Sequence, residues 1–279
     1  MNYKQNLHTH TVYCDGKNTP EEMVDKAISL GFQSIGFSGH AKMPFPNVWG
    51  MTEENTQKYI KEILRIKEKY KGRIDVILGT ELDNFSKVDL SPYEYVICSC
   101  HHIEKDGEHL QVDGSKDAVN ELIERVYGGD GLLFAKDYYE SLKKIEPRNK
   151  NDIVGHFDLV TKHRDIANFF DSECEDYKSY ALDALHCLAK KFDVFEMNTG
   201  AISRGYRKKP YPDDFILKEL KRLNKKIVIT SDCHNANFLD CQFEECEKIL
   251  KSVGFDEIYS LIEGKFVAQK IQCFIGLEL

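Results

Sequence analysis

Short apolar runs alternate with helical patterns from residue 5 to residue 230, and this alternation restricts the fold more than any other feature of the chain. The runs cover residues 5–8, 34–37, 74–78, 95–99, 152–155, 194–197 and 226–230. The stretch Ile227 to Ile229 is continuously apolar, which is typical of a strand covered on both faces. Strands joined by crossover helices pair in parallel. The sequence therefore predicts an α/β fold with a parallel sheet.

Three helical segments are indicated by capping residues and periodicity. Thr19 is a typical N-cap, Pro20 suits the first turn, and Glu22 follows three residues after the cap, whereas Gly31 is typical of the end of that helix. A second helix is expected from about residue 52 to residue 70. A third would gather apolar side chains on one face; these are Tyr177, Tyr180, Ala181, Ala184, Leu185 and Leu188.

Histidine and acidic residues recur where a predicted strand gives way to a loop. They are His8, His10, Asp15, His40, Glu81, His101, His156, Asp232 and His234. Nine potential ligands are too many for one ion, since a structural zinc site closes with about four. Residues after successive strands converge only if the strand ends form a ring, as at the C-terminal face of a barrel. An open doubly wound sheet fits the same alternation, but the ligand pattern favours the closed barrel.

Two pairs of these residues give the strongest local signals. Side chains two apart in an extended chain point to the same side, so His8 and His10 can reach one ion, and so can Asp232 and His234. Glu81 adds a carboxylate, which can bridge two cations and lower their mutual repulsion. We therefore expect a cluster of divalent metals and a metal-dependent hydrolase.

Charge and composition exclude several classes of protein. The formal net charge of −8, with 46 acidic against 38 basic residues, argues against a general nucleic-acid binder. A hydrophobic content of 42% is too high for a disordered chain. The nine cysteines include no CxxC pair, and we expect most of them to be reduced. With no signal-peptide core and no apolar run of membrane-spanning length, we expect a cytoplasmic location.

Domain organisation and loops can also be inferred from the pattern. Because no linker, repeat or low-complexity segment interrupts the chain, we expect a single domain over residues 1–279. Residues 103–114 are polar and glycine-punctuated, and we interpret them as a long loop. A second loop, residues 41–51, carries two prolines and the only tryptophan, Trp49, and is expected to form a pocket wall or lid.

These motifs, in this order, resemble the PHP (polymerase and histidinol phosphatase) family. The opening HTHTVYCDG resembles the family's first metal motif, and FSGH, GTE, CHH, GHFD and SDCH resemble the later ones. One departure is Gly39, because family members often have an acidic residue before this histidine. The resemblance implies a distorted (β/α)7 TIM-like barrel with three divalent metal ions at the C-terminal ends of the strands.

The resemblance also implies how the ligands are shared. His8, His10, Glu81 and Asp232 would hold the first metal, Glu81 would bridge to a second completed by His101 and His156, and Asp15, His40 and His234 would hold a third. Mixed imidazole and carboxylate ligands suit zinc, manganese or iron. Glu81 and Asp232 are accordingly predicted catalytic residues. Since His101 and His102 are adjacent, only one can point into the ring, and we expect this to be His101.

The segments HAKMPFP, GHFDLVTKH and EMNTGAISRG are most similar to the histidinol-phosphatase branch of the family. The implied reaction is hydrolysis of L-histidinol phosphate, a small-molecule phosphate ester, by metal-activated hydroxide in histidine biosynthesis. Lys162, Arg204 and Arg207 are candidates for binding the phosphate, although exposed surface cations are an equally good interpretation of each. Trp49 is a candidate for binding the rest of the substrate. His102 is a candidate catalytic proton donor, alongside His163 and water.

Three other interpretations stay open at this point. The same site could act on another phosphomonoester, a nucleotide or a phosphodiester. C–N bond hydrolysis is a second possibility, since related metal barrels perform it. The third is a non-catalytic domain in which metals only stabilise the fold. The oligomeric state is open as well.

Overall fold

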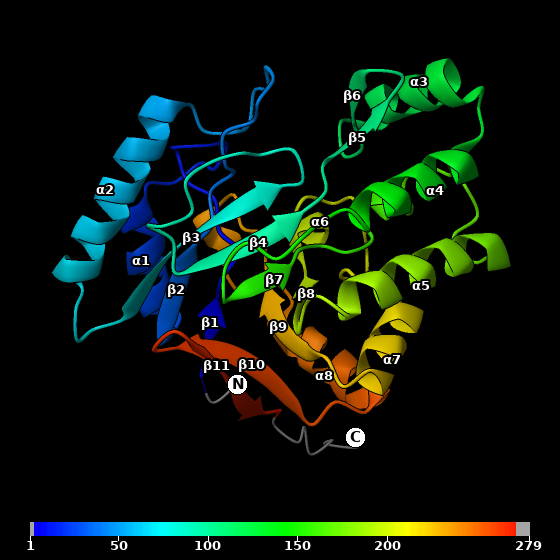
Figure 1. Cartoon of the computed structure of the whole chain (residues 1–279). Helices are drawn as coiled ribbons and strands as arrows, with labels where there is room; N and C mark the ends of the chain where they lie inside the picture. The colour runs from blue at the N-terminus through cyan, green and yellow to red at the C-terminus, as the bar shows by residue number, and fades with distance from the viewer. Residues whose placement is uncertain (1–2, 272–279) are drawn as a thin grey trace.

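The computed structural model describes residues 3–271 and confirms the parallel α/β arrangement. Seven parallel strands form one sheet in the order β1-β2-β3-β4-β7-β8-β9, and helices surround it (Figure 1). Their bounds are Gln5–Asn6 (β1), Ser34–Phe37 (β2), Asp75–Asp83 (β3), Tyr95–Ser99 (β4), Asp152–Val154 (β7), Val194–Asn198 (β8) and Lys226–Thr230 (β9). Each strand overlaps one of the seven apolar runs identified in the sequence, and β3 continues past its run, which ends at residue 78, to Asp83.

The two ends of this sheet meet just beyond β1. Thr9 and Cys233 form an isolated parallel bridge. The backbone N–H of His10 donates to the carbonyl of Cys233 at 2.9 Å, and the N–H of Cys233 donates to the carbonyl of His8 at 3.1 Å. The sheet is therefore a nearly closed barrel, and its closure runs through the histidine pair of the first motif.

Helices pack around the outside of the barrel. They are α1 (Pro20–Ser29), α2 (Glu53–Lys69), α3 (Lys116–Tyr127), α4 (Gly131–Leu142), α5 (Glu175–Ala189), α6 (Gly200–Ser203), α7 (Asp214–Arg222) and α8 (Phe243–Val253), with short 3-10 turns at Leu159–Thr161 and Ala236–Phe238. The three predicted helices are confirmed as α1, α2 and α5. The Thr19 side chain and Glu22 form the expected capping box at the start of α1. No helix separates β3 from β4, which distorts the regular alternation.

The barrel interior is apolar toward its lower end, which is the end where the parallel strands begin. This part of the core consists of Leu7, Ile77, Tyr95, Ile97, Ile153, Val194, Val228 and Leu261. The ring of Tyr95 fills the interior so closely that a Cβ on Gly79 would lie 2.3 Å from it, which explains the glycine two residues before Glu81. The hairpin of β10 (Glu257–Ile262) and β11 (Lys265–Lys270) lies beneath β1 and β9 and covers this end, where Gln5 donates to the carbonyl of Leu261 at 2.8 Å (Figure 1).

The interpretation of residues 103–114 as a long loop was wrong. β5 (His102–Lys105) and β6 (Glu108–Gln111) form an antiparallel hairpin there, beyond the end of β4 (Figure 1). Its turn consists of Asp106 and Gly107, both with positive φ. Asp-Gly is a strong signal for a two-residue hairpin turn, and this signal could have been used. Residues 41–51, in contrast, contain neither helix nor strand, as predicted.

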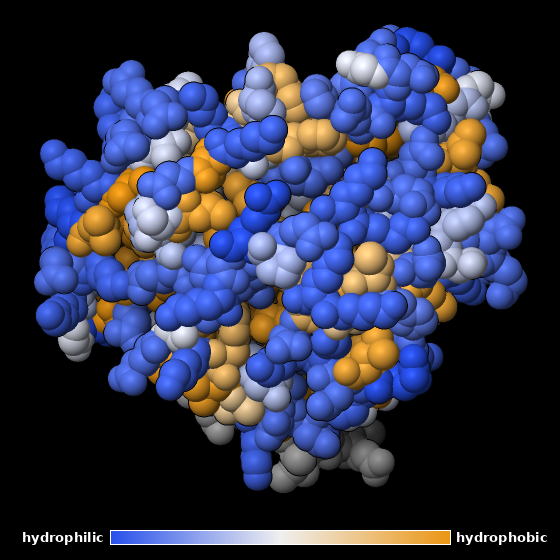
Figure 2. Space-filling model, in the orientation of Figure 1, coloured by the Kyte–Doolittle hydropathy of each residue, from blue (hydrophilic) through white to orange (hydrophobic). Residues whose placement is uncertain are grey.

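The outer surface is consistent with the acidic, polar composition. Hydrophilic residues cover most of the face seen in Figure 2, and apolar residues show in smaller areas. Within residues 3–271, none of the helices combines the length and the apolarity that crossing a membrane requires. Cys14, Cys98, Cys100, Cys174, Cys187, Cys233, Cys241 and Cys246 are all free thiols.

Candidate metal centre

Glu81 lies at the centre of the cluster, near the C-terminal end of β3, which is the upper end of the barrel in Figure 1. Its Oε2 is 2.9 Å from His40 Nδ1 and 3.2 Å from His8 Nε2. Its Oε1 is 2.9 Å from His156 Nε2 and 3.3 Å from His101 Nε2. One buried carboxylate thus faces imidazoles from four other strand ends, and this is the arrangement required of a ligand that bridges two cations.

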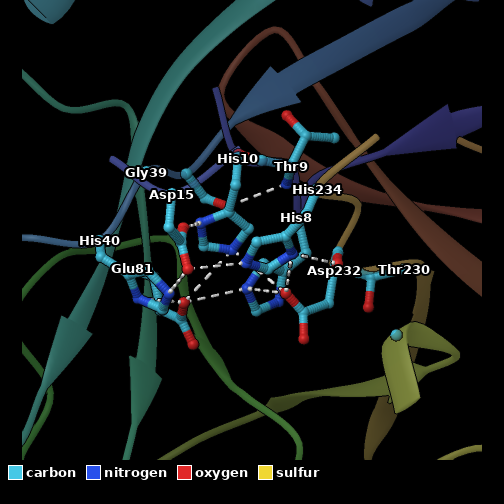
Figure 3. A network of polar contacts seen from close by, with 12 residues as sticks. His8, Thr9, His10, Asp15, Gly39, His40, Glu81, Thr230, Asp232 and His234 are labelled. Atoms are coloured by element: carbon cyan, nitrogen blue, oxygen red, sulfur yellow. Dashed lines mark hydrogen bonds and ion pairs between the residues drawn. The ribbon is translucent and has the colours of Figure 1, made fainter. Parts of the chain in front are cut away.

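The second central carboxylate, Asp232, follows β9. Its Oδ1 lies 3.2 Å from His10 Nε2 and 3.6 Å from His8 Nε2. Figure 3 shows these side chains pointing toward one another and toward Glu81. The bridge between Thr9 and Cys233 sets this geometry, because it holds the segments that follow β1 and β9 side by side.

A third set of ligands lies on the outer side of His10. His234 Nε2 is 3.2 Å from Asp15 Oδ2, and His40 Nε2 is 3.8 Å from the same oxygen. Asp15 reaches this position because the chain turns tightly at Gly16, where a Cβ would lie 2.4 Å from the backbone of His10. A glycine is therefore required for the aspartate to return to the histidine pair.

Four groups of residues bring nitrogen and oxygen ligand atoms within 4.8 Å of one another. They are His10, Asp15, His40 and His234; His8, Glu81 and His156; His8, His10 and Asp232; and His40, Glu81 and His101. All nine ligands predicted from the sequence belong to at least one group. The groups share members, so the nine residues form one continuous cluster.

The unpaired atoms of this cluster fit divalent metal ions. His8 Nε2, His10 Nε2, His40 Nδ1 and Glu81 Oε2 are buried and have no hydrogen-bond partner. A buried polar atom without a partner costs free energy, and orphans of this kind are rare in folded proteins. Imidazole nitrogens and carboxylate oxygens converging on one point are a typical ligand set for a transition metal.

The two central carboxylates remain ionised. Burial alone would raise the pKa of Glu81, but the surrounding imidazoles, His8 and His40 first, outweigh burial and hold its pKa well below the ordinary value. The pKa of Asp232 is likewise held well below its ordinary value, since Arg204 and His8 outweigh the effect of burial. Ionised carboxylates are the form that binds cations.

The histidines differ in their protonation. Burial and the neighbouring rings of His234 and His40 lower the pKa of His10 to about 3, so this imidazole is neutral at neutral pH and offers a lone pair to a metal. Burial would also lower the pKa of His8, but nearby carboxylates, Glu196 first, outweigh it and raise its pKa well above the ordinary value. Protons and metal ions therefore compete for His8.

A cavity of about 340 Å³ opens over the cluster. It is lined by Asp15, His40, Trp49, His101, Gln111, Asp113, Gly114, Ser115, His156, Leu159, Lys162, Arg204, Tyr206, Asp232 and His234. Ligand atoms thus form its floor, while Lys162 and Arg204 provide positive charge beside them. A larger groove of about 690 Å³ runs between α2 and the loop after β3, but none of its lining residues belongs to the cluster.

The PHP domain model matches residues 6–200, which is more than half of the chain. The chain belongs to the PHP family. It is 26% identical over 263 residues to the histidinol-phosphatase of Bacillus subtilis strain 168, covering 86% of this chain and 97% of that one. It is also 26% identical over 271 residues to the histidinol-phosphatase of Lactococcus lactis subsp. lactis IL1403, covering 91% of this chain and 93% of that one.

Two solved structures have the same fold as this chain. The hisK protein of Listeria monocytogenes superposes with a TM-score of 0.73 at 23% identity, over 87% of this chain and 99% of that one. Histidinol phosphate phosphatase of Lactococcus lactis, solved with zinc, L-histidinol and phosphate, superposes with a TM-score of 0.66 at 21% identity, over 95% of this chain and 98% of that one. The match to this PHP chain therefore extends past residue 200, to the part that carries Asp232 and His234.

Three predicted substrate residues line the cavity of this PHP chain. Arg204 donates from Nη2 to Asp232 Oδ2 at 2.9 Å and from Nη1 to the carbonyl of Asp232 at 3.1 Å. The ammonium group of Lys162 lies 3.6 Å from the Asp113 carboxylate. The centroid of the Trp49 ring lies 4.5 Å from the centroid of the His40 ring, and Trp49 forms a wall of the cavity. The interpretation of Lys162 and Arg204 as simple surface cations is therefore not supported.

The prediction that Arg207 is a candidate for binding the phosphate requires a correction, because Arg207 does not line the cavity. Its side chain is fully buried. It donates to Thr161 Oγ1 and to Asp213 Oδ1, each at 2.6 Å, and lies 3.5 Å from Asp158 Oδ2. A guanidinium that is enclosed and paired in this way cannot reach a phosphate, so its role in this fold is structural.

His102 is also placed differently from the expectation. Its ring stacks on the ring of Trp49, with 5.6 Å between the two ring centroids, and its Nδ1 lies 3.5 Å from Asp83 Oδ2. It does not line the cavity. The ring of His163 bonds through Nε2 to the carbonyl of Gly114 at 2.8 Å and does not line it either. These positions do not support either histidine as the donor of a proton to a leaving group.

Two buried carboxylates were missed in the sequence. Asp83, at the end of β3, accepts from the backbone N–H of His101 at 2.8 Å. Glu196, in β8, accepts from His8 Nδ1 at 2.9 Å. The sequence carried a signal for Glu196, since it lies between two apolar residues of a predicted strand and side chains alternate along a strand. In the structure these neighbours, Phe195 and Met197, pack outside the barrel. A glutamate between them must point into the barrel.

Proposed function

We propose that this chain is a metal-dependent phosphomonoesterase that hydrolyses L-histidinol phosphate to L-histidinol and phosphate in cytoplasmic histidine biosynthesis. The observation that carries the proposal is the cavity in which Lys162 and Arg204 stand beside the ligand cluster. Positive side chains next to a metal centre suit a phosphate ester, whose oxygens are negatively charged. Two curated relatives that align over most of this chain are histidinol-phosphatases, and one relative was solved with L-histidinol and phosphate.

We assign three divalent ions to the cluster. The first set is His8, His10, Glu81 and Asp232; the second is Glu81, His101 and His156; the third is Asp15, His40 and His234. Zinc, manganese and iron all suit these ligands, and zinc is the ion in the Lactococcus lactis relative. Bound metals would supply activation of the attacking water and neutralisation of phosphate charge.

The remaining roles belong to side chains around the cavity. Arg204 binds a phosphate oxygen with its Nη atoms, which the contact to Asp232 already holds beside the cluster. Lys162 binds a second oxygen from the opposite segment, and its pairing with Asp113 limits its freedom. Trp49 covers the organic part of the substrate and reduces the access of bulk water.

The test compares phosphate release from a panel of esters under identical metal conditions. The panel contains L-histidinol phosphate, a nucleoside monophosphate, a phosphodiester and p-nitrophenyl phosphate. We expect the highest kcat/KM for L-histidinol phosphate, loss of activity with chelator, and recovery when zinc, manganese or iron is added back. A higher kcat/KM for any other ester would reject the substrate, whereas activity that survives complete metal removal would reject the mechanism.

A further inference from the structure

Among residues 3–271, β8 is the one strand of the barrel whose upper end supplies none of the clustered ligands. The groups that could hold metal draw on Glu81, inside the end of β3, and on residues after β1, β2, β4, β7 and β9. β8 instead carries Glu196, whose side chain is fully buried. It belongs to none of the four groups. A buried carboxylate in this position needs hydrogen-bonding or charged partners, because burial of a charge is costly unless it is paired.

The interior of the barrel is layered, and this explains where Glu196 lies. Val194 belongs to the apolar interior, and Glu196 follows two residues later on the same side of β8. In β9, Thr230 stands in the same relation to Val228. Glu196 therefore lies in a polar layer between the apolar floor and the metal centre, directly below the ligands. It is placed to contact their far sides.

Both oxygens of Glu196 hold residues of the cluster. Oε2 accepts from His8 Nδ1 at 2.9 Å and from Thr230 Oγ1 at 2.7 Å. Oε1 accepts from the backbone N–H of His156 at 2.6 Å and from Asn198 Nδ2 at 2.8 Å. Four donors satisfy this carboxylate completely, so it has no oxygen left for a metal. Its contacts to His8 and His156 are its link to the centre.

The contact to His8 determines which nitrogen faces the cluster. A carboxylate can only accept, so Nδ1 carries a proton and Nε2 is the nitrogen that faces the cluster, where a bound metal would take the place of its proton. That Nε2 is buried and has no hydrogen-bond partner, and it lies 3.2 Å from Glu81 Oε2. A carboxylate behind a ligating histidine orients the ring and raises its basicity. The hydrogen bond to the N–H of His156 fixes the backbone of a second ligand in the same way.

We propose that Glu196 is a positioning residue of the metal centre, which fixes the tautomer and orientation of His8 and the backbone of His156. The proposal rests on the metal centre of the preceding section and is independent of the substrate. Because His8 belongs to two of the four ligand groups and shares one of them with His156, Glu196 supports both through a single side chain.

The test is the metal affinity of Glu196→Gln, measured by competition with a chromophoric chelator on the folded protein. Glutamine keeps the size of the side chain, but its NH2 group replaces one oxygen and must face the two donors of that oxygen, so at least one contact is lost. We expect metal affinity to fall about 10–100-fold with an unchanged circular dichroism spectrum. Affinity and metal content equal to those of the wild type would overturn the proposal.

Thr230→Val is the matched control, because it removes a donor from the same Glu196 oxygen without touching His8. We expect it to bind metal like the wild type. An equal loss of metal in Thr230→Val and Glu196→Gln would assign the effect to barrel packing and would also overturn the proposal.

A measurement on the unmodified protein decides the question if Glu196→Gln does not fold. Nitrogen-15 NMR of the zinc-loaded chain should show the His8 ring bound through Nε2 and protonated at Nδ1. Binding through Nδ1 would refute the positioning role. A wild-type chain that takes up no metal would instead refute the metal centre itself, so the two failures can be told apart.

Discussion

Arg204 donates a hydrogen bond from Nη2 to Asp232 Oδ2 at 2.9 Å, so a cavity cation and a candidate metal ligand are joined directly. This contact uses the oxygen of Asp232 that does not face His10, whose Nε2 is 3.2 Å from Oδ1. The two oxygens thus have separate partners. The guanidinium is fixed beside the cluster without occupying the oxygen that points into it.

Arg204→Gln is expected to reduce kcat/KM for the phosphate ester about 100–1,000-fold, the range found when one preorganised transition-state donor is removed. Metal content should be unchanged, because the ligands remain. Phosphate release and metal content on the same sample provide the measurement. Lys208→Gln, an exposed cation four residues away, is the control and should retain activity. Equal activity in the two variants would exclude a phosphate contact by Arg204.

His10→Ala is expected to lose both metal and turnover, since His10 belongs to two of the four ligand groups. Metal per chain by mass spectrometry and phosphate release measure the two effects. The control is His186→Ala, because that ring lies 45% exposed on α5 and pairs with Glu219, far from the cluster in the fold. If His10→Ala keeps its full metal content and activity, the ligand assignment is wrong.

Metal loading is expected to reverse the pH dependence of stability. Burial lowers the pKa of His8 and His101, but carboxylates, Glu196 for His8 and Glu81 for His101, raise it by more, so both pKa values lie well above the ordinary value without metal. A pKa raised by folding adds stability below the unfolded pKa, and this stability is lost as pH rises through the folded pKa.

The Tm of the metal-free protein should therefore fall as pH increases from about 6 to about 9, through these two histidines. The Tm of the metal-loaded protein should rise toward neutral pH, because protons compete with metal for the same nitrogens. Thermal melts of chelator-treated and metal-loaded samples at matched pH give the two slopes. Slopes of the same sign would contradict a metal site built on these histidines.

Trp49 should report metal binding by fluorescence. It is the only tryptophan of the chain, and its ring lies 4.5 Å from His40 and 5.3 Å from His101. Titrating zinc into the metal-free protein is expected to change its emission, and Asp232→Asn should weaken the response. An emission that stays constant while metal content rises would place Trp49 away from the occupied site.

Arg207→Met is expected to destabilise the fold by about 3–5 kcal/mol, because it removes a buried guanidinium from two buried carboxylates, Asp158 and Asp213. Asp213 keeps its ion pair with Arg164, so Asp158 is the carboxylate left without a cationic partner. Urea unfolding of the metal-free protein measures the loss, with Arg204→Gln as a control expected to cost much less. A stability equal to that of the wild type would exclude the structural role of Arg207.

The arrangement of elements followed from local patterns. Apolar runs such as Ile227 to Ile229 and the capping box at Thr19 depend on residues close in sequence, and the structure has them where they were expected. The candidate ligands could be identified because histidine and acidic residues recur at the ends of successive predicted strands, and ordinary core histidines have no reason to recur there. The hairpin of β5 and β6 was also predictable from local sequence, because Asp106 and Gly107 form its turn.

The tertiary structure alone separated Arg204 from Arg207, three residues apart in one segment. Both are cations after a strand, and nothing in their spacing says that one meets Asp232 and the other is enclosed by Thr161 and Asp213. Partners distant in sequence decide this. The same holds for His102, which packs behind Trp49.

The sequence by itself therefore determined the parallel α/β fold and the set of residues available to bind metal, since periodicity and strand-end position are local properties. Only the tertiary structure decided which of these residues lie next to one another and which side chains hold them in place. Closure of the barrel between Thr9 and Cys233 brings together ligands more than 200 positions apart, and Glu196 reaches His8 across the same closure. Which side chains meet inside a closed ring depends on register and burial, and these are fixed when all strands pack at once.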